Sequence, residues 1–115
     1  MIKGVGIDIV EIQRIQKAIE RWGKGFLDHV FTAEEIAWIK RYKSPYQHYA
    51  GRFAAKEAIF KAVGDQRISW KDLTILNDAK GKPYCRCRKK GLSGRILLTI
   101  SHSKEYAVAQ AIVTQ

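Results

Sequence analysis

Two acidic residues and one lysine are the side chains of this sequence best placed to do chemistry. Asp8 follows two glycines in Gly4-Val5-Gly6-Ile7-Asp8, and Glu57 and Lys61 stand four residues apart in a segment with helical periodicity. Magnesium sites use one or two carboxylates together with waters and substrate phosphates. A lysine one helical turn beyond Glu57 would reach the same phosphates. One hypothesis is therefore a magnesium and phosphate site built from Asp8, Glu57 and Lys61.

Each of these residues also has a structural interpretation. Asp8 stands shortly before a predicted helix and is suited to cap it. Glu57 and Lys61 can pair with each other, although such a pair on an open helix face contributes only ~0.3–0.5 kcal/mol. The residues around them are mostly apolar, so both charges should be partly buried and need partners. Either the two satisfy each other, or Glu57 meets a cation and Lys61 meets an anion.

A row of cations marks the segment 10–22. Arg14, Lys17 and Arg21 recur at helical spacing, and no acidic residue interrupts the row. Such a row is commonly a solvated helix face, but an uninterrupted one favours docking to an acidic partner. The whole chain agrees, since its 21 Lys and Arg against 11 Asp and Glu give a net charge of +10. An excess of this size predicts an anionic partner.

The elements that position these residues begin with a strand. Residues 4–10 alternate, and we expect a buried strand whose apolar side chains are Val5, Ile7 and Ile9. The two glycines leave the other face bare, so another backbone or a ligand can approach it closely. Asp8 shares that bare face.

Helical patterns follow the strand. Residues 10–22 predict a helix whose buried stripe is Ile12, Ile15, Ile19 and Trp22. A second helix opens at Thr32 with a capping box to Glu35, directs Ile36 and Ile39 inward, and breaks before Ser44-Pro45. A third helix spans residues 46–63 and ends at Gly64.

The last part of the chain predicts strands. We expect them at residues 73–76, 84–88, 96–101 and 106–113, with a hairpin turn over 77–83. The sequence thus predicts a small α+β fold, with three helices packed on a mainly antiparallel sheet in a single domain spanning 1–115.

Composition limits the class of protein. Of the 115 residues, 46% are hydrophobic and 28% are charged, which is typical of globular domains and argues against disorder. We expect no membrane helix, no signal peptide and a cytoplasmic location. The two cysteines, Cys85 and Cys87, are expected to be reduced thiols with neither a disulfide nor a zinc site.

Several of these segments together resemble the 4′-phosphopantetheinyl transferases, and in particular the small acyl-carrier-protein synthase group. The first two blocks are the segment with Asp8 and the segment Phe53-Ala54-Ala55-Lys56-Glu57-Ala58 with Lys61 one turn on. The turn near Gly81-Lys82-Pro83 and the segment Thr99-Ile100-Ser101-His102-Ser103 with Tyr106-Ala107-Val108-Ala109 resemble the remaining blocks. Because four blocks occur in the family order within so short a chain, the resemblance is specific.

The resemblance implies a reaction. The 4′-phosphopantetheine arm of coenzyme A would be transferred to a serine of an acidic apo acyl carrier protein, in support of fatty acid biosynthesis. Asp8 and Glu57 would bind Mg²⁺, Lys61 would bind phosphate, and Glu57 through a water or Asp8 would take the serine proton. Arg14, Lys17 and Arg21 would bind the carrier protein.

Further expectations follow from the resemblance. His102, on the loop between the last strands, would contact coenzyme A phosphate, with a structural histidine as the alternative. Arg52 and Lys43 are candidates for the 3′-phosphate. The family also implies a homotrimer with active sites between subunits, where Arg52 of one chain approaches Asp8 and Glu57 of another. Neither nucleic acid nor membrane is an expected partner.

The sequence departs from the family pattern at three places. Asp65-Gln66 replaces the Thr-Gly that tends to follow Gly64, Phe60 is bulkier than usual, and residues 86–90 are unusually basic. The alternative function is a basic domain that binds single-stranded nucleic acid, to which the basic stretch and nearby aromatic residues would be suited. That alternative leaves Asp8 and Glu57 unexplained.

Overall fold

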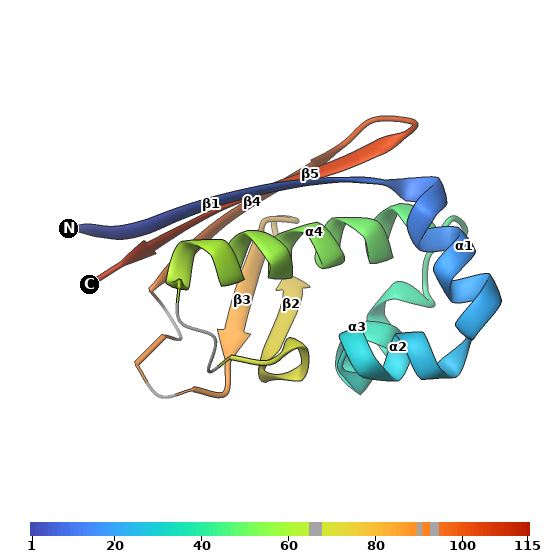
Figure 1. Cartoon of the computed structure of the whole chain (residues 1–115), viewed down its shortest axis with the longest axis horizontal. Coiled ribbons are helices and arrows are strands. Elements are labelled where there is room, and N and C mark those ends of the chain that lie inside the picture. The colour runs from blue at the N-terminus through green and yellow to red at the C-terminus, as the bar shows by residue number, and fades with distance from the viewer. Residues whose placement is uncertain (65–67, 90, 93–94) are drawn as a thin grey trace.

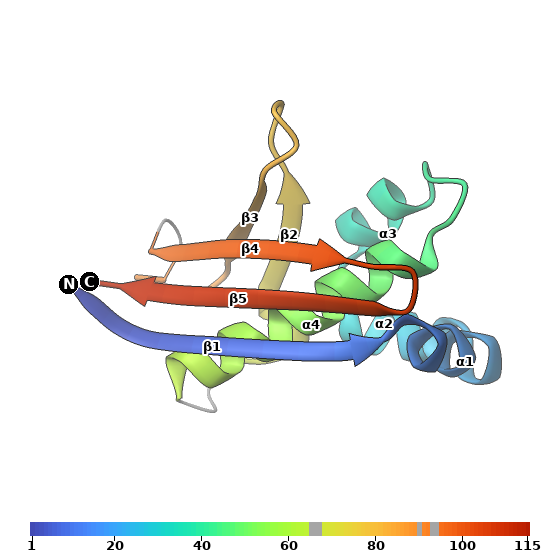
Figure 2. The same cartoon turned by 90° about the horizontal axis from the view of Figure 1, so that it is seen from above.

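Three strands form the sheet on which the rest of the protein is built. The computed structural model describes residues 1–64, 68–89, 91–92 and 95–115. Strand β1 (Ile2–Glu11) pairs antiparallel with β5 (Tyr106–Thr114), which pairs antiparallel with β4 (Ile96–His102), so the spatial order is β1-β5-β4. The predicted strands near the C-terminus are thereby confirmed, and Figure 2 shows the three strands side by side.

The long helix α4 (Tyr46–Val63) lies along one face of this sheet. On the other side of α4 stands a two-stranded hairpin, β2 (Leu73–Asn77) and β3 (Pro83–Cys87), preceded by the 3-10 turn η1 (Trp70–Asp72) (Figure 1). Because it is covered on two sides, α4 is apolar almost all round its axis, as its sequence predicts. Its predicted bounds of 46–63 are confirmed, and Gly64 ends it in the left-handed conformation.

Glycines on β1 allow α4 to approach the strand at backbone distance. A Cβ atom at Gly4 would lie 1.8 Å from the carbonyl oxygen of Ala62, and one at Gly6 would lie 1.9 Å from that of Ala58. Real Cβ atoms do not tolerate such distances, so these positions require glycine. The predicted close approach at the bare face is confirmed, and the approaching backbone is that of α4.

The other side of β1 differs from the prediction that Val5, Ile7 and Ile9 are buried. Val5, Ile7 and Ile9 alternate as expected, but they are exposed in this chain, with Ile7 at 60% of its accessible surface. The buried face of the strand is the glycine face, because only that face lets the α4 backbone come close. The alternation was therefore right and the predicted buried side was wrong.

The first predicted helix also differs from the structure. Helix α1 (Ile12–Trp22) ends at Gly23, whose φ is 54°, and a separate helix α2 (Lys24–Val30) follows. Ile15 is buried as predicted, but Trp22 is 62% exposed. The chain turns at Gly23, so α1 ends at the margin of the core, and Phe26 and Leu27 of α2 continue the packing instead.

Helix α3 (Ala33–Ile39) begins as predicted. Thr32 and Glu35 form the predicted capping box, and Ile39 is fully buried. With α2 counted, residues 1–64 contain four α-helices instead of the three that we predicted. The α+β class with antiparallel sheets is confirmed.

Cys85 and Cys87 are both buried on the same face of β3, and neither forms a disulfide within the described residues. Burial raises the pKa of the Cys85 thiol to about 12, so this group is a packing element rather than a nucleophile. Among the described residues, no helix has the length and apolar character needed to cross a membrane.

Candidate active site

Asp8 lies on the glycine face of β1 and is directed at the α4 residue Lys61. The Lys61 ammonium Nζ lies 3.2 Å from Asp8 Oδ1 and donates a 2.9 Å hydrogen bond to the carbonyl oxygen of Ile7. The interpretation of Asp8 as a helix cap is wrong, because α1 has Glu11 at its N-cap position and no side-chain cap. The Asp8 side chain is only 17% exposed, so its carboxylate is partly desolvated.

Glu57 faces the same cavity as Asp8. This cavity has a volume of about 370 Å³ and lies between β1, α1, α2 and α4. Burial raises the pKa of Glu57, the negative charge of Asp8 raises it further, and Lys61 opposes both effects. The negative charge of Asp8 therefore acts on Glu57 across the cavity, although the two residues are 49 positions apart in sequence.

Lys61 pairs with Asp8 and, among the described residues, not with Glu57. The sequence left two arrangements open, and Lys61 follows the second, in which it meets an anion; that anion is Asp8 of β1. The ammonium group stays available, since the Lys61 side chain is 53% exposed. It also lines a second cavity of about 390 Å³, together with Glu57, Phe60, Ile68, Ser69 and Trp70.

The donor set suits a divalent cation. A cation between the two carboxylates would offset the repulsion by Asp8 that helps to raise the pKa of Glu57, and Mg²⁺ accepts such oxygen ligands while keeping positions for water and phosphate. Among the described residues, no group of three or more metal-ligating side chains occurs, so these residues alone do not enclose an ion. A site with two carboxylates would depend on the substrate for further ligands.

Arg52 and His102 lie together in a different cavity. This cavity is smaller, about 170 Å³, and His48 and Tyr42 also line it. His102 is the last residue of β4 rather than a loop residue, and it is exposed. Lys43 is exposed on the segment before α4 and is not among the residues that line this cavity.

Arg52 is held firmly. Only 4% of its surface is exposed, its Nε donates a 2.9 Å hydrogen bond to the carbonyl oxygen of Ile75, and its Nη2 donates one of 2.8 Å to Asn77 Oδ1. Burial lowers the pKa of His48, and the charges of Arg52 and His102 lower it further. This cavity is therefore electropositive, which suits an anionic group.

Within one chain, the carboxylate group (Asp8, Glu57 and Lys61) is separate from the group of Arg52 and His102. The cavities that hold Asp8, Glu57 and Lys61 share no lining residue with the cavity that holds Arg52 and His102. The carboxylates lie where α4 meets β1, whereas Arg52 is directed at β2.

Residues 4–111 match the profile of the 4′-phosphopantetheinyl transferase superfamily, almost the whole chain. This chain belongs to that superfamily.

Its relatives within the superfamily share both sequence and fold. A holo-[acyl-carrier-protein] synthase of Protochlamydia amoebophila is 47% identical, covering 97% of this chain and 98% of that protein. A crystal structure of the Bacillus anthracis synthase in complex with CoA (3′,5′-ADP) is 40% identical with a TM-score of 0.85, covering 98% of this chain and 96% of that one. The Neisseria meningitidis synthase is 32% identical with a TM-score of 0.89, and each chain is fully covered.

The cationic row of this phosphopantetheinyl transferase lies on the surface. Arg14, Lys17 and Arg21 are all exposed on α1, and Arg14 also lines the cavity of Asp8 and Glu57. The guanidinium of Arg21 covers the exposed ring of Trp22 at 4.9 Å from its centroid. A cationic surface thus adjoins the carboxylate cavity.

Two residues that line the cavity of Arg52 and His102 were missed from the sequence. His48 and Tyr42 stack on each other, with 3.7 Å between ring centroids, beside His102. For His48 a signal existed, since it precedes Arg52 by four residues and must share its helix face. Tyr42 lies outside α4, and no local pattern connects it to Arg52.

The described part of the basic stretch, residues 86–89, lines none of the cavities of the candidate site. Arg86 pairs with Glu34, and Arg88 and Lys89 are exposed. Lys90 and the family departure at Asp65-Gln66 lie outside the described residues. Since the chain matches the transferase family over 4–111, the comparisons do not support the nucleic-acid alternative.

Proposed function

We propose that this protein transfers the 4′-phosphopantetheine group of coenzyme A to a serine hydroxyl of apo acyl carrier protein, releasing adenosine 3′,5′-bisphosphate. The products would be holo acyl carrier protein for fatty acid biosynthesis, made in the cytoplasm by one transferase domain spanning 1–115. The observation that carries the proposal is the convergence of Asp8 from β1 and Glu57 from α4 on one cavity, with Lys61 at its edge.

Asp8 and Glu57 would hold Mg²⁺ in this cavity. When bound, the ion would neutralise charge on the diphosphate of coenzyme A. Lys61 binds phosphate oxygens with its exposed ammonium group and offsets the charge that develops on the leaving group. Glu57, whose pKa is raised, takes the serine proton through a water, with Asp8 as the other candidate base.

Arg52, His102 and Lys43 would bind the anionic nucleotide end of coenzyme A. Support comes from the electropositive cavity around Arg52 and from the Bacillus anthracis synthase, whose structure contains CoA (3′,5′-ADP). Because this cavity and the carboxylate cavity are separate within one chain, a complete site would need a second subunit.

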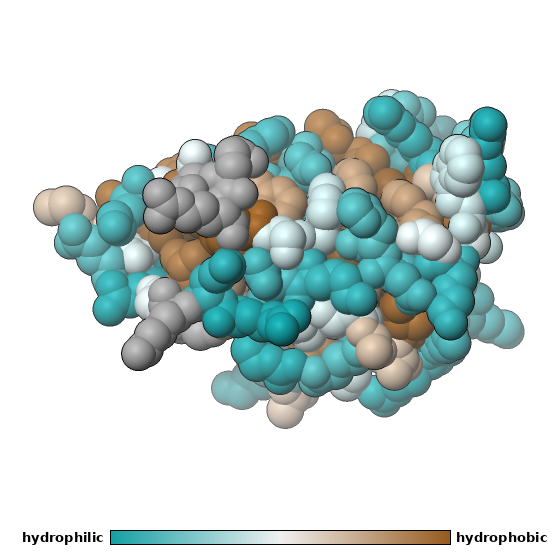
Figure 3. Space-filling view, turned by 60° about the horizontal axis from the view of Figure 1, so that its bottom comes forward, coloured by the Kyte–Doolittle hydropathy of each residue, from teal (hydrophilic) through white to brown (hydrophobic). Residues whose placement is uncertain are grey.

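A homotrimer would supply that subunit. The outer face of the three-stranded sheet carries exposed apolar side chains, namely Ile2, Val5, Ile7, Ile9, Leu97 and Tyr106. Apolar faces of this kind are commonly covered by another protein surface. The opposite side of the molecule is mostly hydrophilic, as Figure 3 shows. We therefore place the subunit contacts at the sheet, with active sites between neighbouring chains.

Helix α1 would bind the carrier protein. The exposed cations Arg14, Lys17 and Arg21 match the strongly acidic surface of carrier proteins, and opposite charges raise the rate of encounter. The position of Arg14 at the rim of the carboxylate cavity would bring the carrier serine to the proposed reaction centre.

The test is direct. An apo carrier protein is incubated with this protein, coenzyme A and Mg²⁺, and its mass is followed by mass spectrometry. We expect the mass to increase by one phosphopantetheine group, and Glu57→Gln to abolish the increase while carrier binding is retained. Unchanged carrier mass with the folded wild-type protein would refute the proposal. A melting temperature raised by single-stranded RNA, and not by coenzyme A with Mg²⁺, would favour the nucleic-acid alternative.

A further inference from the structure

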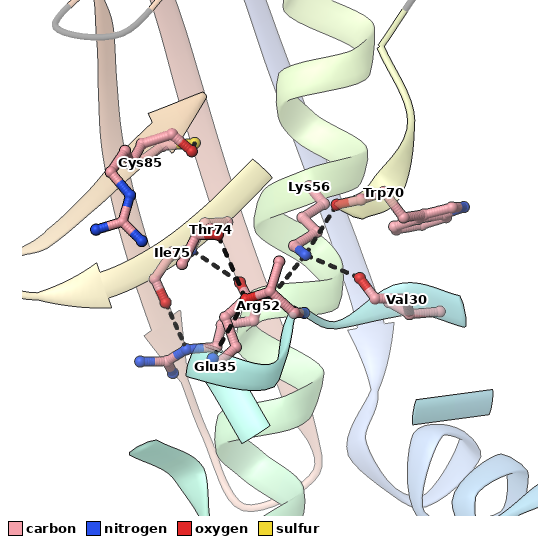
Figure 4. A network of polar contacts seen from close by, with 10 residues as sticks. Val30, Glu35, Arg52, Lys56, Trp70, Thr74, Ile75 and Cys85 are labelled. Carbon is pink, nitrogen blue, oxygen red and sulfur yellow. Dashed lines mark hydrogen bonds and ion pairs between the residues drawn. The ribbon is translucent and has the colours of Figure 1, made fainter. Parts of the chain in front are cut away.

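A buried ion pair between α3 and α4 has no part in the mechanism described above. Glu35 of α3 and Lys56 of α4 are both fully buried, and Lys56 Nζ lies 2.7 Å from Glu35 Oε1. Lys56 immediately precedes Glu57 on α4, and its ammonium group is directed towards Glu35 of α3 and Trp70 of η1 (Figure 4).

The ammonium group of Lys56 connects three segments. It donates to Glu35 Oε1, to the carbonyl oxygen of Val30 at 2.8 Å and to the carbonyl oxygen of Trp70 at 3.0 Å. Three N–H donors thus meet three acceptors, which is the full capacity of a lysine. Figure 4 shows these contacts converging from α2, α3 and η1.

Glu35 is equally well satisfied. Its Oε1 accepts a hydrogen bond from the backbone N–H of Thr32, and its Oε2 accepts one of 2.8 Å from the backbone N–H of Ile75. The pair therefore joins the start of α3 and strand β2 to the middle of α4. Replacement of a buried ion pair by apolar residues is often neutral or stabilising, so stability alone does not account for it.

Trp70 connects this pair to the active site. Its ring stacks on Phe53 with 5.1 Å between centroids and meets Phe60 edge-on at 5.0 Å. Phe53 and Phe60 lie four residues before and three residues after Glu57, so they flank it on the helix surface. Trp70 also lines the cavity that contains Glu57 and Lys61.

We propose that the Glu35–Lys56 pair positions the cavity lined by Glu57, Lys61 and Trp70. By binding the carbonyl oxygen of Trp70, the pair holds the aromatic ring of Trp70 beside Glu57 and Lys61. Lys56 and Glu35 are positioning residues that touch neither substrate nor metal. The inference rests on the proposed function, and it predicts an effect on coenzyme A rather than on the carrier protein, which would dock on α1.

The main variant is the double substitution Glu35→Gln/Lys56→Met, which leaves no unpaired buried charge but removes the donor to Trp70. We expect the KM for coenzyme A to rise about tenfold and the KM for carrier protein to change by less than about twofold. A control variant, Ile39→Val, loses core packing in α3 and keeps Glu35, Lys56 and Trp70. A variant that only folds less completely would lower the apparent kcat and leave both KM values unchanged.

A double-mutant cycle with Trp70→Ala provides the second measurement. If the pair acts through Trp70, Glu35→Gln/Lys56→Met should change the KM for coenzyme A much less in the Trp70→Ala background than in the wild type. Additive effects, or a KM for coenzyme A equal to that of Ile39→Val, would overturn the proposal.

Thermal shift separates this proposal from the proposed function. Coenzyme A with Mg²⁺ should raise the melting temperature of the wild type and of Ile39→Val, and raise that of Glu35→Gln/Lys56→Met much less. If the wild type binds coenzyme A but transfers nothing, the proposed function fails while the positioning proposal is still decided by these shifts. If the wild type does not bind coenzyme A, both fail.

Discussion

Asp8 and Glu57 show how the fold makes two ordinary carboxylates unusual. Each comes from an apolar or glycine-rich element, and the packing of α4 on β1 brings both to one cavity. Burial and mutual repulsion then disfavour ionisation of Glu57. A protein that only needed a stable fold would gain by replacing one of these acids, so their presence favours a ligand that uses both.

The raised pKa of Glu57 predicts a pH-dependent stability. The ionised form of Glu57 is less favourable in the folded protein than in the unfolded chain, where the pKa of a glutamate is about 4.5. Glu57→Gln should therefore raise the melting temperature at neutral pH. The gain should disappear as the pH falls below about 4, where the carboxyl is protonated in both states.

Calorimetry at several pH values checks this prediction, with Asp28→Asn on the exposed surface of α2 as the control. Millimolar Mg²⁺ should also raise the melting temperature of the wild type more than that of Glu57→Gln. A melting temperature that Glu57→Gln lowers at neutral pH would contradict the electrostatic explanation.

At the scale of elements, the contact between β1 and α4 is decisive. Both carboxylates depend on it, and it exists because Gly4 and Gly6 have no side chains. The sequence pattern predicted a close approach at these glycines, but it did not distinguish between a ligand and another element as the approaching group.

The β1–α4 contact predicts a large effect of one methyl group. In Gly6→Ala the new Cβ would collide with the Ala58 carbonyl, and we expect a loss of roughly 3 kcal/mol or more in unfolding free energy. Gly25→Ala, which adds the same methyl group in open space on α2, should stabilise the protein by about 0.5–1 kcal/mol. Urea unfolding measures both, and similar values for the two variants would refute the packing argument.

Helix α1 predicts a charge effect on the carrier protein. Lys17→Glu/Arg21→Glu should raise the KM for carrier protein by at least about tenfold and leave the KM for coenzyme A unchanged, since the exposed cations would attract the acidic partner. The wild-type KM should itself rise with salt. The control Lys71→Glu/Arg88→Glu makes the same charge change beside the β2–β3 hairpin. Equal effects of the two pairs would mean that only net charge matters.

The whole molecule presents an apolar sheet face and two separate candidate cavities. Both features would suit the proposed homotrimer, in which Asp8 and Glu57 of one chain would complete a site with Arg52 and His102 of its neighbour. Among the elements seen in Figure 1, none covers the outer face of the described β1-β5-β4 sheet. Within the described part of the chain, apolar surface thus remains exposed there.

A complementation experiment tests the composite site. Glu57→Gln and His102→Ala should each be inactive, but subunits of the two variants, exchanged by mild denaturation and mixed equally, should recover about a quarter of the wild-type activity. This fraction is the chance that a site receives one intact half from each of two chains. Adding Ile7→Lys to both variants should disrupt the sheet contact and prevent recovery. No recovery from the first mixture would contradict shared sites.

Local patterns predicted much of this protein. The capping box at Thr32, the bounds of α4 and its end at Gly64, and the hairpin over 77–83 depend on residues close in sequence, and all are confirmed. The turn at Gly23 was harder to predict from the sequence, because a helix with an apolar stripe can end at a glycine or continue through it. The exposure of Trp22 followed from that turn.

By itself, the sequence determined the family and the α+β class and supplied the residues of the candidate site, because these depend on composition, periodicity and ordered motifs. Only the tertiary structure decided which side of β1 is buried, that Lys61 pairs with Asp8 rather than Glu57, and that Lys56 and Glu35 are joined behind the cavity. Each of these outcomes depends on contacts between elements distant along the chain. A side chain's own neighbours do not specify which remote backbone or charge will face it.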